Sequence, residues 1–461
     1  MDIESGFSRL ESENKKINVT NAFNRFSKLF DNGDFIELDR FAKNGEKHCG
    51  VITAYGNVNG IGVYAFSQDS TVYSGAMSRA QSEKIKKVYE LALMNGAPIV
   101  AVYDSNGAFA EEGIDALNAY GELIKLSSKI SGVVPQISVI AGKCIGSAAI
   151  LAGIADVSVM VKDASFCVNS AAITGNGMVG TADTCAKNGT AGIITDSDID
   201  AMNVVSKLIS MLPSNNLSVA AVTEYVPSTT VGEGVYSTIS SFVDADSFIE
   251  LYKDFGCCGK VGFARICGNS VGVVTMDSSV NDGKLCGNGS AKISRFVRLC
   301  DAFSIPIVTF LDCKGFMGKA DDELDGSVKS VASLTAAYAE ATTVKITVIT
   351  GSAYGAAFTC FAGKASGIDY CISYADAEIC PLEPKTAVQF IYNERLGTEK
   401  REDLEKEYIL TEGSPFKAAQ NGNVDSIVTA DKALGELIGA LYMLNSKRVS
   451  TLDKKHSNMP F

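Results

Sequence analysis

The chain reads QISVIAGKCIGSAA at residues 136–149 and, in a related form, KITVITGSAYGAAF at residues 345–358. In both segments a short β-branched run passes directly into a stretch rich in glycine and alanine. Such runs are typical of strands buried on both faces, and the small residues after them predict the start of a packed helix. The two segments lie at an offset of 209 residues, as between Gly146 and Gly355.

The similarity extends outward from these segments. Residues 84–107 resemble residues 292–315 at an offset of 208, and Asp156 corresponds to Asp369 at an offset of 213. A slowly drifting offset is what loop insertions produce in two copies of one fold. We therefore predict an α/β protein of two tandem domains, residues 1–235 and 236–461, with helices as crossovers between buried strands. Turn-forming residues between Val226 and Asp244 favour this boundary.

The composition excludes several functions. A net charge of −12 without a long basic run argues against a nucleic-acid partner. Only two histidines are present among 461 residues, which argues against a histidine-based triad or metal centre. No Gly-x-x-x-x-Gly-Lys-Ser/Thr loop for ATP occurs. The thirteen cysteines lack a Cys-x-x-Cys pair and the start is unlike a signal peptide, so we expect reduced thiols, a cytoplasmic location and no metal.

Two loops in each half place glycine directly after a predicted strand. In the first half they are Asn106-Gly107-Ala108 and Gly142 to Ser147, and in the second half they contain Gly315-Phe316 and Gly351 to Ala356. A strand that runs into a helix start leaves backbone N–H groups unpaired, and such donors stabilise an oxyanion. The alternative is that small residues only permit close packing of helix on strand. Recurrence in both halves favours the oxyanion interpretation.

Further segments carry a family resemblance over nearly the whole chain. They read LFDNGDFIE at 29–37, FSQD at 66–69, SGVVPQ at 131–136, SPFKAA at 414–419 and KKHSNMPF at 454–461. Together with the repeat, they resemble the carboxyltransferase subunits of biotin-dependent acyl-CoA carboxylases and decarboxylases. Within that family the likeness is to the propionyl-CoA carboxylase beta subunit and the methylmalonyl-CoA decarboxylase alpha subunit.

This resemblance implies two tandem crotonase-like domains (ClpP/crotonase superfamily) that move a carboxyl group between biotin and acetyl-, propionyl- or methylmalonyl-CoA. It assigns the acyl-CoA to the first half, with catalytic backbone donors at Gly146 and Ser147 and binding positions at Asn106, Gly107, Ala108 and Gly142. It assigns biotin to the second half, with donors at Gly355 and Ala356 and binding positions at Gly315, Phe316 and Tyr354. Biotin itself would be the base.

The resemblance also implies partners. The chain lacks an Ala-Met-Lys-Met attachment site, so biotin is expected on a separate biotin carboxyl carrier protein. A biotin carboxylase or a membrane decarboxylase subunit would complete the complex. The family builds its site where the N-terminal half of one subunit faces the C-terminal half of another, so we expect a homo-oligomer, commonly a hexamer.

The sequence departs from the family at several positions, which keeps two alternatives open. Ser147 and Ala356 stand where the family has glycine, Phe109 stands where it has arginine, and residues 185–189 lack its paired glycines. One alternative is a non-catalytic scaffold subunit of such a complex. The other is a crotonase-type hydratase or hydrolase, which would need Glu111 or Glu112 as an acid or base near the oxyanion loop.

Overall fold

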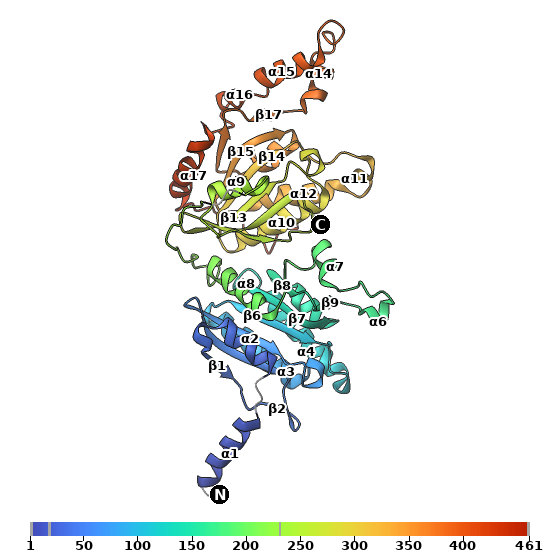
Figure 1. Cartoon of the computed structure of the whole chain (residues 1–461), viewed down its shortest axis with the longest axis vertical. Coiled ribbons are helices and arrows are strands. Elements are labelled where there is room, and N and C mark those ends of the chain that lie inside the picture. The colour runs from blue at the N-terminus through green and yellow to red at the C-terminus, as the bar shows by residue number, and fades with distance from the viewer. Residues whose placement is uncertain (1–2, 17–19, 230–231, 459–461) are drawn as a thin grey trace. The chain divides into compact units, whose positions relative to one another are not determined.

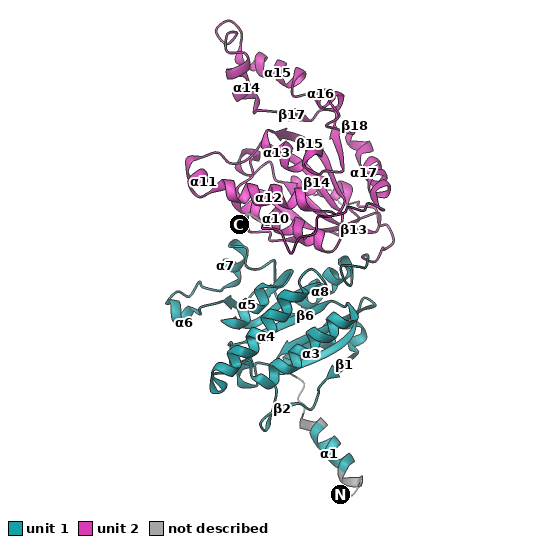
Figure 2. Cartoon of the chain, turned by 180° about the vertical axis from the view of Figure 1, so that it is seen from behind, with its two compact units in different colours: residues 1–219 teal, residues 220–461 magenta. Residues whose placement is uncertain are grey.

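The computed structural model describes residues 3–16, 20–229 and 232–458, and the chain forms two compact units, Met1–Val219 and Ala220–Phe461 (Figure 1, Figure 2). The last three residues of the tail that resembles the family, 459–461, lie outside the described residues. The division between the units precedes the predicted boundary at 235/236. The assignment of residues 1–235 to acyl-CoA and of 236–461 to biotin stays a prediction.

Unit 1 contains an eight-stranded sheet with helices around it. The strand order is β1 (Phe35–Leu38), β4 (Val51–Val58), β5 (Ile61–Gln68), β6 (Ile99–Ser105), β7 (Gln136–Ile145), β8 (Val157–Val161) and β10 (Ile193–Thr195), with β9 (Ser165–Cys167) paired to β7. A separate hairpin is formed by β2 (Lys43–Asn44) and β3 (Lys47–His48). The helices are α1 (Ile3–Lys16), α2 (Asn21–Leu29), α3 (Arg79–Asn95), α4 (Ile114–Ile130), α5 (Ser147–Gly153), α6 (Ala171–Thr174), α7 (Ala182–Lys187) and α8 (Asp198–Met211).

Unit 2 repeats this arrangement. Its strand order is β11 (Ile249–Leu251), β12 (Gly259–Ile266), β13 (Asn269–Met276), β14 (Ile307–Cys313), β15 (Lys345–Tyr354), β16 (Tyr370–Tyr374) and β18 (Ser426–Val428), with β17 (Glu378–Cys380) paired to β15. Its helices are α9 (Val235–Phe242), α10 (Gly287–Ala302), α11 (Ala320–Leu324), α12 (Ser327–Glu340), α13 (Ala356–Phe361), α14 (Pro384–Ile391), α15 (Arg401–Thr411), α16 (Pro415–Gln420) and α17 (Ala430–Leu444). The two units together also contain short 3-10 segments, which span Asp31–Gly33, Tyr73–Gly75 and Ala110–Glu112 in unit 1 and Asn281–Gly283 and Lys364–Ser366 in unit 2.

The two sheets agree in pairing as well as in strand order. In each, the first two pairings are antiparallel and the rest are parallel. Val100 pairs with Ile137 in unit 1, and Val308 pairs with Ile346 in unit 2. The register shifts at the same place, before Ser105 and before Cys313. The predicted duplication, and with it the α/β class, is confirmed.

Helices cover both faces of the sheet in unit 2. On one face, Phe310 of β14 packs against Phe242 of α9, with ring centroids 4.5 Å apart, in a core that α17 also joins. Toward the other face, the hydroxyls of Thr309 and Tyr338 of α12 are 2.8 Å apart. Successive strand residues point to opposite faces, so a strand covered on both must be apolar throughout. This is why the β-branched run of β15 does not alternate with charged residues.

Within the described residues, no helix combines the length and the apolar character needed to cross a bilayer.

Gly121 offers a test of the helix assignment. It lies exposed inside α4, and a Cβ there would have no protein atom within 4 Å. Alanine restricts the unfolded chain more than glycine does, so Gly121→Ala is expected to raise the free energy of unfolding by about 0.5–1 kcal/mol in urea denaturation. Gly113→Ala is the matched control, because Gly113 precedes the same helix in equally open space but has φ 56°. It is expected to lose stability; a gain there would contradict the reasoning.

Candidate active site

In each half, the strand that pairs with β6 or β14 runs through a glycine directly into a helix. Strand β7 passes through Gly146 into α5, and β15 passes through Gly355 into α13. Gly146 has φ 65° and ψ −129°, and Gly355 has φ 53° and ψ −127°. The Gly146 N–H donates to the Cys167 carbonyl at 3.1 Å, and the Gly355 N–H donates to the Cys380 carbonyl at 2.8 Å. Only glycine adopts this conformation without strain, so the two glycines are set by the backbone path.

The first N–H groups after these glycines have no hydrogen-bond partner within their own helix. Because Ser147 and Ala148 open α5, and Ala356 and Ala357 open α13, the helix itself supplies no carbonyl one turn earlier for their N–H groups. A Cβ on Gly146 would have no protein atom within 4 Å. The space beside Gly146 is therefore open, whereas a Cβ on Gly355 would lie 3.4 Å from the Pro381 carbonyl oxygen. A negatively charged oxygen held by such donors in a water-poor site is stabilised by several kcal/mol.

The first glycine loop of each half lies beside the second. Gly107 has φ 102°, and a Cβ there would be 3.1 Å from the Ile145 carbonyl oxygen, next to Gly146. Gly315 has φ 110°, and a Cβ there would be 3.9 Å from the Tyr354 carbonyl oxygen, next to Gly355. The structure thus brings together the residues that the sequence pairs within each half.

These first loops are held by an isolated parallel bridge. Met77 pairs with Ala108, and the Met77 N–H donates to the Gly107 carbonyl at 2.8 Å. In the second half Leu285 pairs with Phe316, and the Leu285 N–H donates to the Gly315 carbonyl at 3.0 Å. Because the bridge fixes the loop backbone, the orientation of its remaining donors depends little on side-chain identity at Asn106, Ala108 or Phe316.

Gly142 has a packing role that the sequence did not indicate. A Cβ there would collide with the Asp104 carboxylate, and a Cβ on Gly351 would collide with that of Asp312. Asp312 accepts the N–H of Ser352 at 2.8 Å. The Asp312 carboxylate therefore braces the strand end that leads into Gly355, and the Asp104 carboxylate packs against the corresponding strand end that leads into Gly146. The recurrence of Asp104 and Asp312 in the repeat was the signal for these positioning residues.

A buried arginine supports Asp104 in the first half. Arg25 of α2, 4% exposed, lies 2.7 Å from the Asp198 carboxylate and 3.5 Å from that of Asp104. The Ser70 hydroxyl also donates to Asp104, at 2.8 Å. A charge buried to this degree is stable only with such partners. Arg25 thus links α2 to Asp104, near the end of β6 and before the Gly107 loop.

Tyr354 turns its side chain into the core. It is 6% exposed, packs with Cys380 and Tyr408, and its hydroxyl donates to the Glu378 carboxylate. Burial, together with the Glu378 carboxylate, raises the pKa of Tyr354, so the hydroxyl stays protonated. In this conformation the backbone of Tyr354, rather than its ring, is the part that lies beside Gly315.

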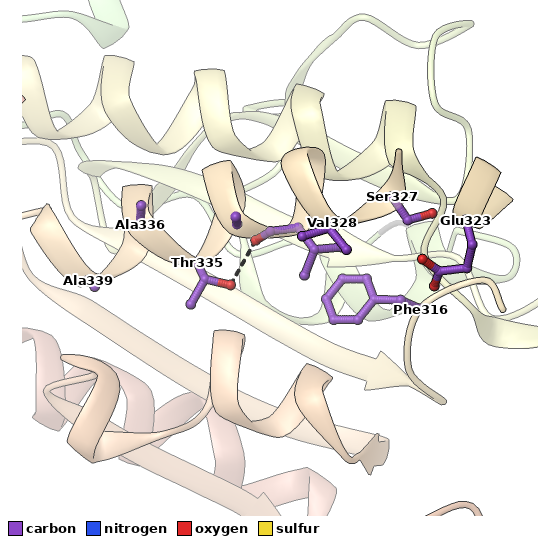
Figure 3. Close-up of a pocket in the computed structure, with 9 residues that line it drawn as sticks. Phe316, Glu323, Ser327, Val328, Thr335, Ala336 and Ala339 are labelled. Carbon is purple, nitrogen blue, oxygen red and sulfur yellow. Dashed lines mark hydrogen bonds between the residues drawn. The ribbon is translucent and has the colours of Figure 1, made fainter. Parts of the chain in front are cut away.

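Phe316 lines a pocket of about 590 Å³ along α12. The lining residues are Phe316, Glu323, Ser327, Val328, Val331, Ala332, Thr335, Ala336 and Ala339. Figure 3 shows Phe316 and Val328 facing the same space, with Thr335 farther along the helix and its hydroxyl bonded to the Val331 carbonyl at 2.8 Å. Small side chains on one face of α12 leave this room. Neither Gly355 nor Ala356 is among the lining residues.

The departures from the family also have structural surroundings. The centroids of the Phe109 and Tyr73 rings are 4.6 Å apart. The Lys47 ammonium lies 4.6 Å from the centroid of the same Tyr73 ring. A positive charge therefore stands one ring away from the position where the family has arginine. The Glu112 carboxylate accepts the Arg79 N–H at 2.6 Å, which gives Glu112 a capping role at α3. Among the described residues, no group of three or more His, Cys, Asp or Glu could hold a metal ion.

Comparison with known proteins agrees with this geometry. A family model described as the carboxyl transferase domain matches residues 14–459. The chain is 34% identical to the propionyl-CoA carboxylase carboxyltransferase subunit of Haloferax mediterranei, covering 99% of this chain and 96% of the relative. It is also 34% identical to the methylmalonyl-CoA decarboxylase subunit alpha of Veillonella parvula, with the same shares covered.

A solved structure shows the same fold. The crystal structure of transcarboxylase 12S, a hexamer with methylmalonyl-CoA and methylmalonic acid bound, matches with a TM-score of 0.93 at 30% identity over 100% of both chains. The predicted architecture of two tandem crotonase-like domains and the predicted enzyme class are confirmed. The chain belongs to the carboxyl transferase family.

Proposed function

We propose that this chain transfers a carboxyl group between biotin on a separate carrier protein and a short acyl-CoA. The helix start after Gly146 holds the thioester oxygen, and the helix start after Gly355 holds the ureido oxygen of biotin. The observation that carries the proposal is that corresponding strands, β7 and β15, each run through a glycine of similar φ and ψ into a helix start, once in each half. Two oxyanion sites are what a transfer between two carbonyl compounds requires.

Two features of the second half suit biotin: the helix start after Gly355, and the separate apolar pocket of Phe316, whose neighbour Gly315 lies beside the Tyr354 carbonyl. The Ala356 and Ala357 N–H groups suit a carbonyl oxygen, and the apolar side chains of Phe316, Val328 and Val331 suit a hydrocarbon chain and ring. Biotin supplies a ureido nitrogen that carries the carboxyl group and accepts a proton. The protein supplies the two sets of donors, which stabilise the thioester enolate and the ureido oxygen without a side-chain base. This division of roles agrees with the scarcity of histidine.

The proposal extends to substrates and partners. The relatives are named for propionyl-CoA and methylmalonyl-CoA, and transcarboxylase 12S was crystallised with methylmalonyl-CoA. We include acetyl-, propionyl- and methylmalonyl-CoA as substrates. The partners are a biotin carboxyl carrier protein and either a biotin carboxylase or a membrane decarboxylase subunit. The chain assembles as a homo-oligomer, a hexamer as in transcarboxylase 12S, in which the first half of one copy faces the second half of another.

The proposal includes a cytoplasmic location, which the free thiols support. All thirteen cysteines lie among the described residues and are free. A cytoplasmic location keeps them reduced.

A transfer assay with labelled substrate tests the function. The purified chain is incubated with free biotin and either malonyl-CoA or methylmalonyl-CoA that carries ¹⁴C in its free carboxyl group. Label is expected to appear in acid-labile carboxylated biotin, with acetyl-CoA or propionyl-CoA as the second product. If the folded chain transfers no label from either thioester, to free biotin or to a biotinylated carrier domain, the scaffold alternative replaces the proposal. Hydration or hydrolysis of the thioester without transfer would favour the crotonase-type alternative.

Phe316 provides a prediction for the biotin side. Truncating its ring removes apolar contact worth about 1.5–3 kcal/mol. Phe316→Ala is therefore expected to raise the KM for free biotin by about tenfold or more and to leave the KM for the thioester unchanged. Phe390→Ala is the control, because Phe390 of α14 is 75% exposed and lies outside the pocket. An equal rise in both KM values for Phe316→Ala would argue against a biotin pocket here.

A further inference from the structure

Two cysteines of unit 2 lie in direct contact, next to Leu285. Leu285 holds the loop of Gly315 and Phe316, which the proposed function assigns to biotin and which we call the biotin-side loop. Cys258 precedes β12, and Cys286 is the N-cap residue of α10. Their sulfur atoms are 3.0 Å apart, although 28 residues separate them in the chain. The Cys286 N–H donates to the Cys258 sulfur at 3.2 Å, and the Gly289 N–H donates to the Cys286 sulfur at 3.3 Å.

The duplicated half shows that the fold does not need these thiols. Gly50 and Ser78 occupy the corresponding positions of unit 1, at the repeat offset of 208 residues. The structure agrees for Gly50, because its carbonyl accepts the Asp69 N–H just as the Cys258 carbonyl accepts the Asp277 N–H. Ser78 caps α3 with its hydroxyl, which accepts the Gln81 N–H at 3.1 Å. Serine is a strongly preferred N-cap residue, and cysteine is not among the preferred ones.

Gly289, which has no side chain, leaves room for the Cys258 sulfur. A Cβ on Gly289 would lie 2.8 Å from it, and the residue at the equivalent position of unit 1 is the large Gln81. The loop that carries Cys258 is fixed to α10 by Lys292, whose ammonium donates to the carbonyls of Tyr252 at 3.1 Å and Phe255 at 2.5 Å. The two sulfurs are therefore held together by both backbones. Helix capping alone does not explain two cysteines at this contact.

The surroundings give the two thiols different reactivity. Donation from the Cys258 thiol, and from the Gly289 and Asn288 N–H groups at the helix start, lowers the pKa of Cys286. The hydrogen bond to Cys286 and burial raise the pKa of Cys258. Cys286 is half-buried, whereas Cys258 is 2% exposed. Cys286 thus has the character of an attacking thiolate, and Cys258 that of a thiol that can react only with its neighbour.

We propose that Cys286 and Cys258 are a peroxide-oxidised thiol pair that closes to a reversible disulfide. The Cys286 thiolate attacks hydrogen peroxide, the O–O bond breaks, and a sulfenic acid and hydroxide form; the hydroxide takes up a proton. The Cys258 sulfur then attacks the sulfenic sulfur, the S–O bond breaks, and water leaves with the Cys258 proton. The two thiols lose two electrons in total, and one peroxide is reduced to two waters.

Closure would act on the biotin-side loop. A disulfide needs the sulfurs at about 2.05 Å, so the N-cap of α10 must move toward β12. Leu285, directly before Cys286, holds the loop on both sides: its N–H donates to the Gly315 carbonyl, and its carbonyl accepts the Met317 N–H at 3.0 Å. Movement at Cys286 therefore strains the bridge that orients Phe316.

Peptide mapping of the full chain tests the pair. The reduced protein is treated with hydrogen peroxide, free thiols are alkylated under denaturing conditions, and the chain is digested with trypsin. Cleavage after lysine releases residues 254–260, with Cys257 and Cys258, and residues 285–292, with Cys286. These two peptides are expected to be linked, and dithiothreitol is expected to separate them.

Two variants identify the sulfurs. Cys257→Ser removes the exposed neighbour and is expected to keep the link. Cys286→Ser installs the cap residue of unit 1, so the fold is preserved, and is expected to lose the link. Loss of the link in Cys257→Ser, or accumulation of sulfinic acid at Cys286 in the parent chain without any link, would overturn the proposal.

Hydrogen exchange tests the effect on the loop. The amides of Leu285 and Met317 are expected to exchange faster in the oxidised chain than in the reduced chain, and at equal rates in the two treatments of Cys286→Ser. Unchanged exchange in a chain shown to be linked would refute the coupling to the biotin-side loop.

Discussion

Replacing Gly146 or Gly355 with alanine is expected to lower the rate of carboxyl transfer by about 10²–10³-fold. The φ near 60° and ψ near −130° at these positions are strained for any residue with a Cβ, at a cost of about 1–3 kcal/mol. Relief of this strain turns the first N–H groups of α5 or α13 away from the bound oxygen. At Gly146 the new methyl group would also stand in the open space that the ligand needs.

The measurement is the rate of label transfer at saturating thioester and biotin, with circular dichroism to establish that the variants are folded. Gly153→Ala is the matched control for Gly146→Ala. Gly153 is exposed at the end of α5, a Cβ there would have no protein atom within 4 Å, and its φ is not positive. It is expected to retain full activity. If Gly146→Ala and Gly355→Ala also stay within about twofold of the parent chain, the backbone donors are not the catalytic groups.

Truncating the centre of either sheet is expected to cost about 2–5 kcal/mol of unfolding free energy. Ile137 of β7 and Ile346 of β15 hold the same register against Val100 and Val308, and they are 0% and 1% exposed. Ile137→Ala and Ile346→Ala each leave a cavity in a sheet that is covered on both faces. Because the two units share one topology, the two losses are expected to be similar in size.

Urea denaturation of the two variants and of two surface controls measures this effect. Ile173→Ala and Ile391→Ala replace side chains that are 75% and 53% exposed, and each is expected to change stability by less than about 0.5 kcal/mol. A loss at Ile137 without a comparable loss at Ile346 would mean that the repeat does not carry equal packing in the two units.

The strands, the helix starts and the duplication were predictable because they depend on local pattern. The run from Ile137 to Ile140 is buried throughout and carries no charge because both faces of its strand are covered, and Gly146 is needed because that position has a positive φ. A strand–glycine–helix pattern that recurs at a nearly constant offset specifies two copies of one fold. The family resemblance of the same segments then predicted the enzyme class, and that prediction is confirmed.

Contacts between distant segments were not predictable. The family resemblance assigned Tyr354 to biotin, and that assignment stays a prediction; only the structure shows that its ring packs into the core against Tyr408 and that its hydroxyl bonds Glu378. Gly142 was assigned to acyl-CoA, which also stays a prediction, and only the structure shows that it makes room for the Asp104 carboxylate of the neighbouring strand. In both cases the chain sets only where the residue falls along the strand, and the direction of the side chain is decided by what packs beside it.

The sequence by itself therefore determined the repeat, the α/β class and the positions of the two glycines that precede α5 and α13, because hydrophobic periodicity and backbone conformation are properties of neighbouring residues. The tertiary structure alone decided the Phe316 pocket, the bracing of both loops by Asp104 and Asp312, and the contact of Cys258 with Cys286. These features arise where strands and helices distant in the chain meet, and the free energy of such contacts depends on distances that no linear pattern encodes.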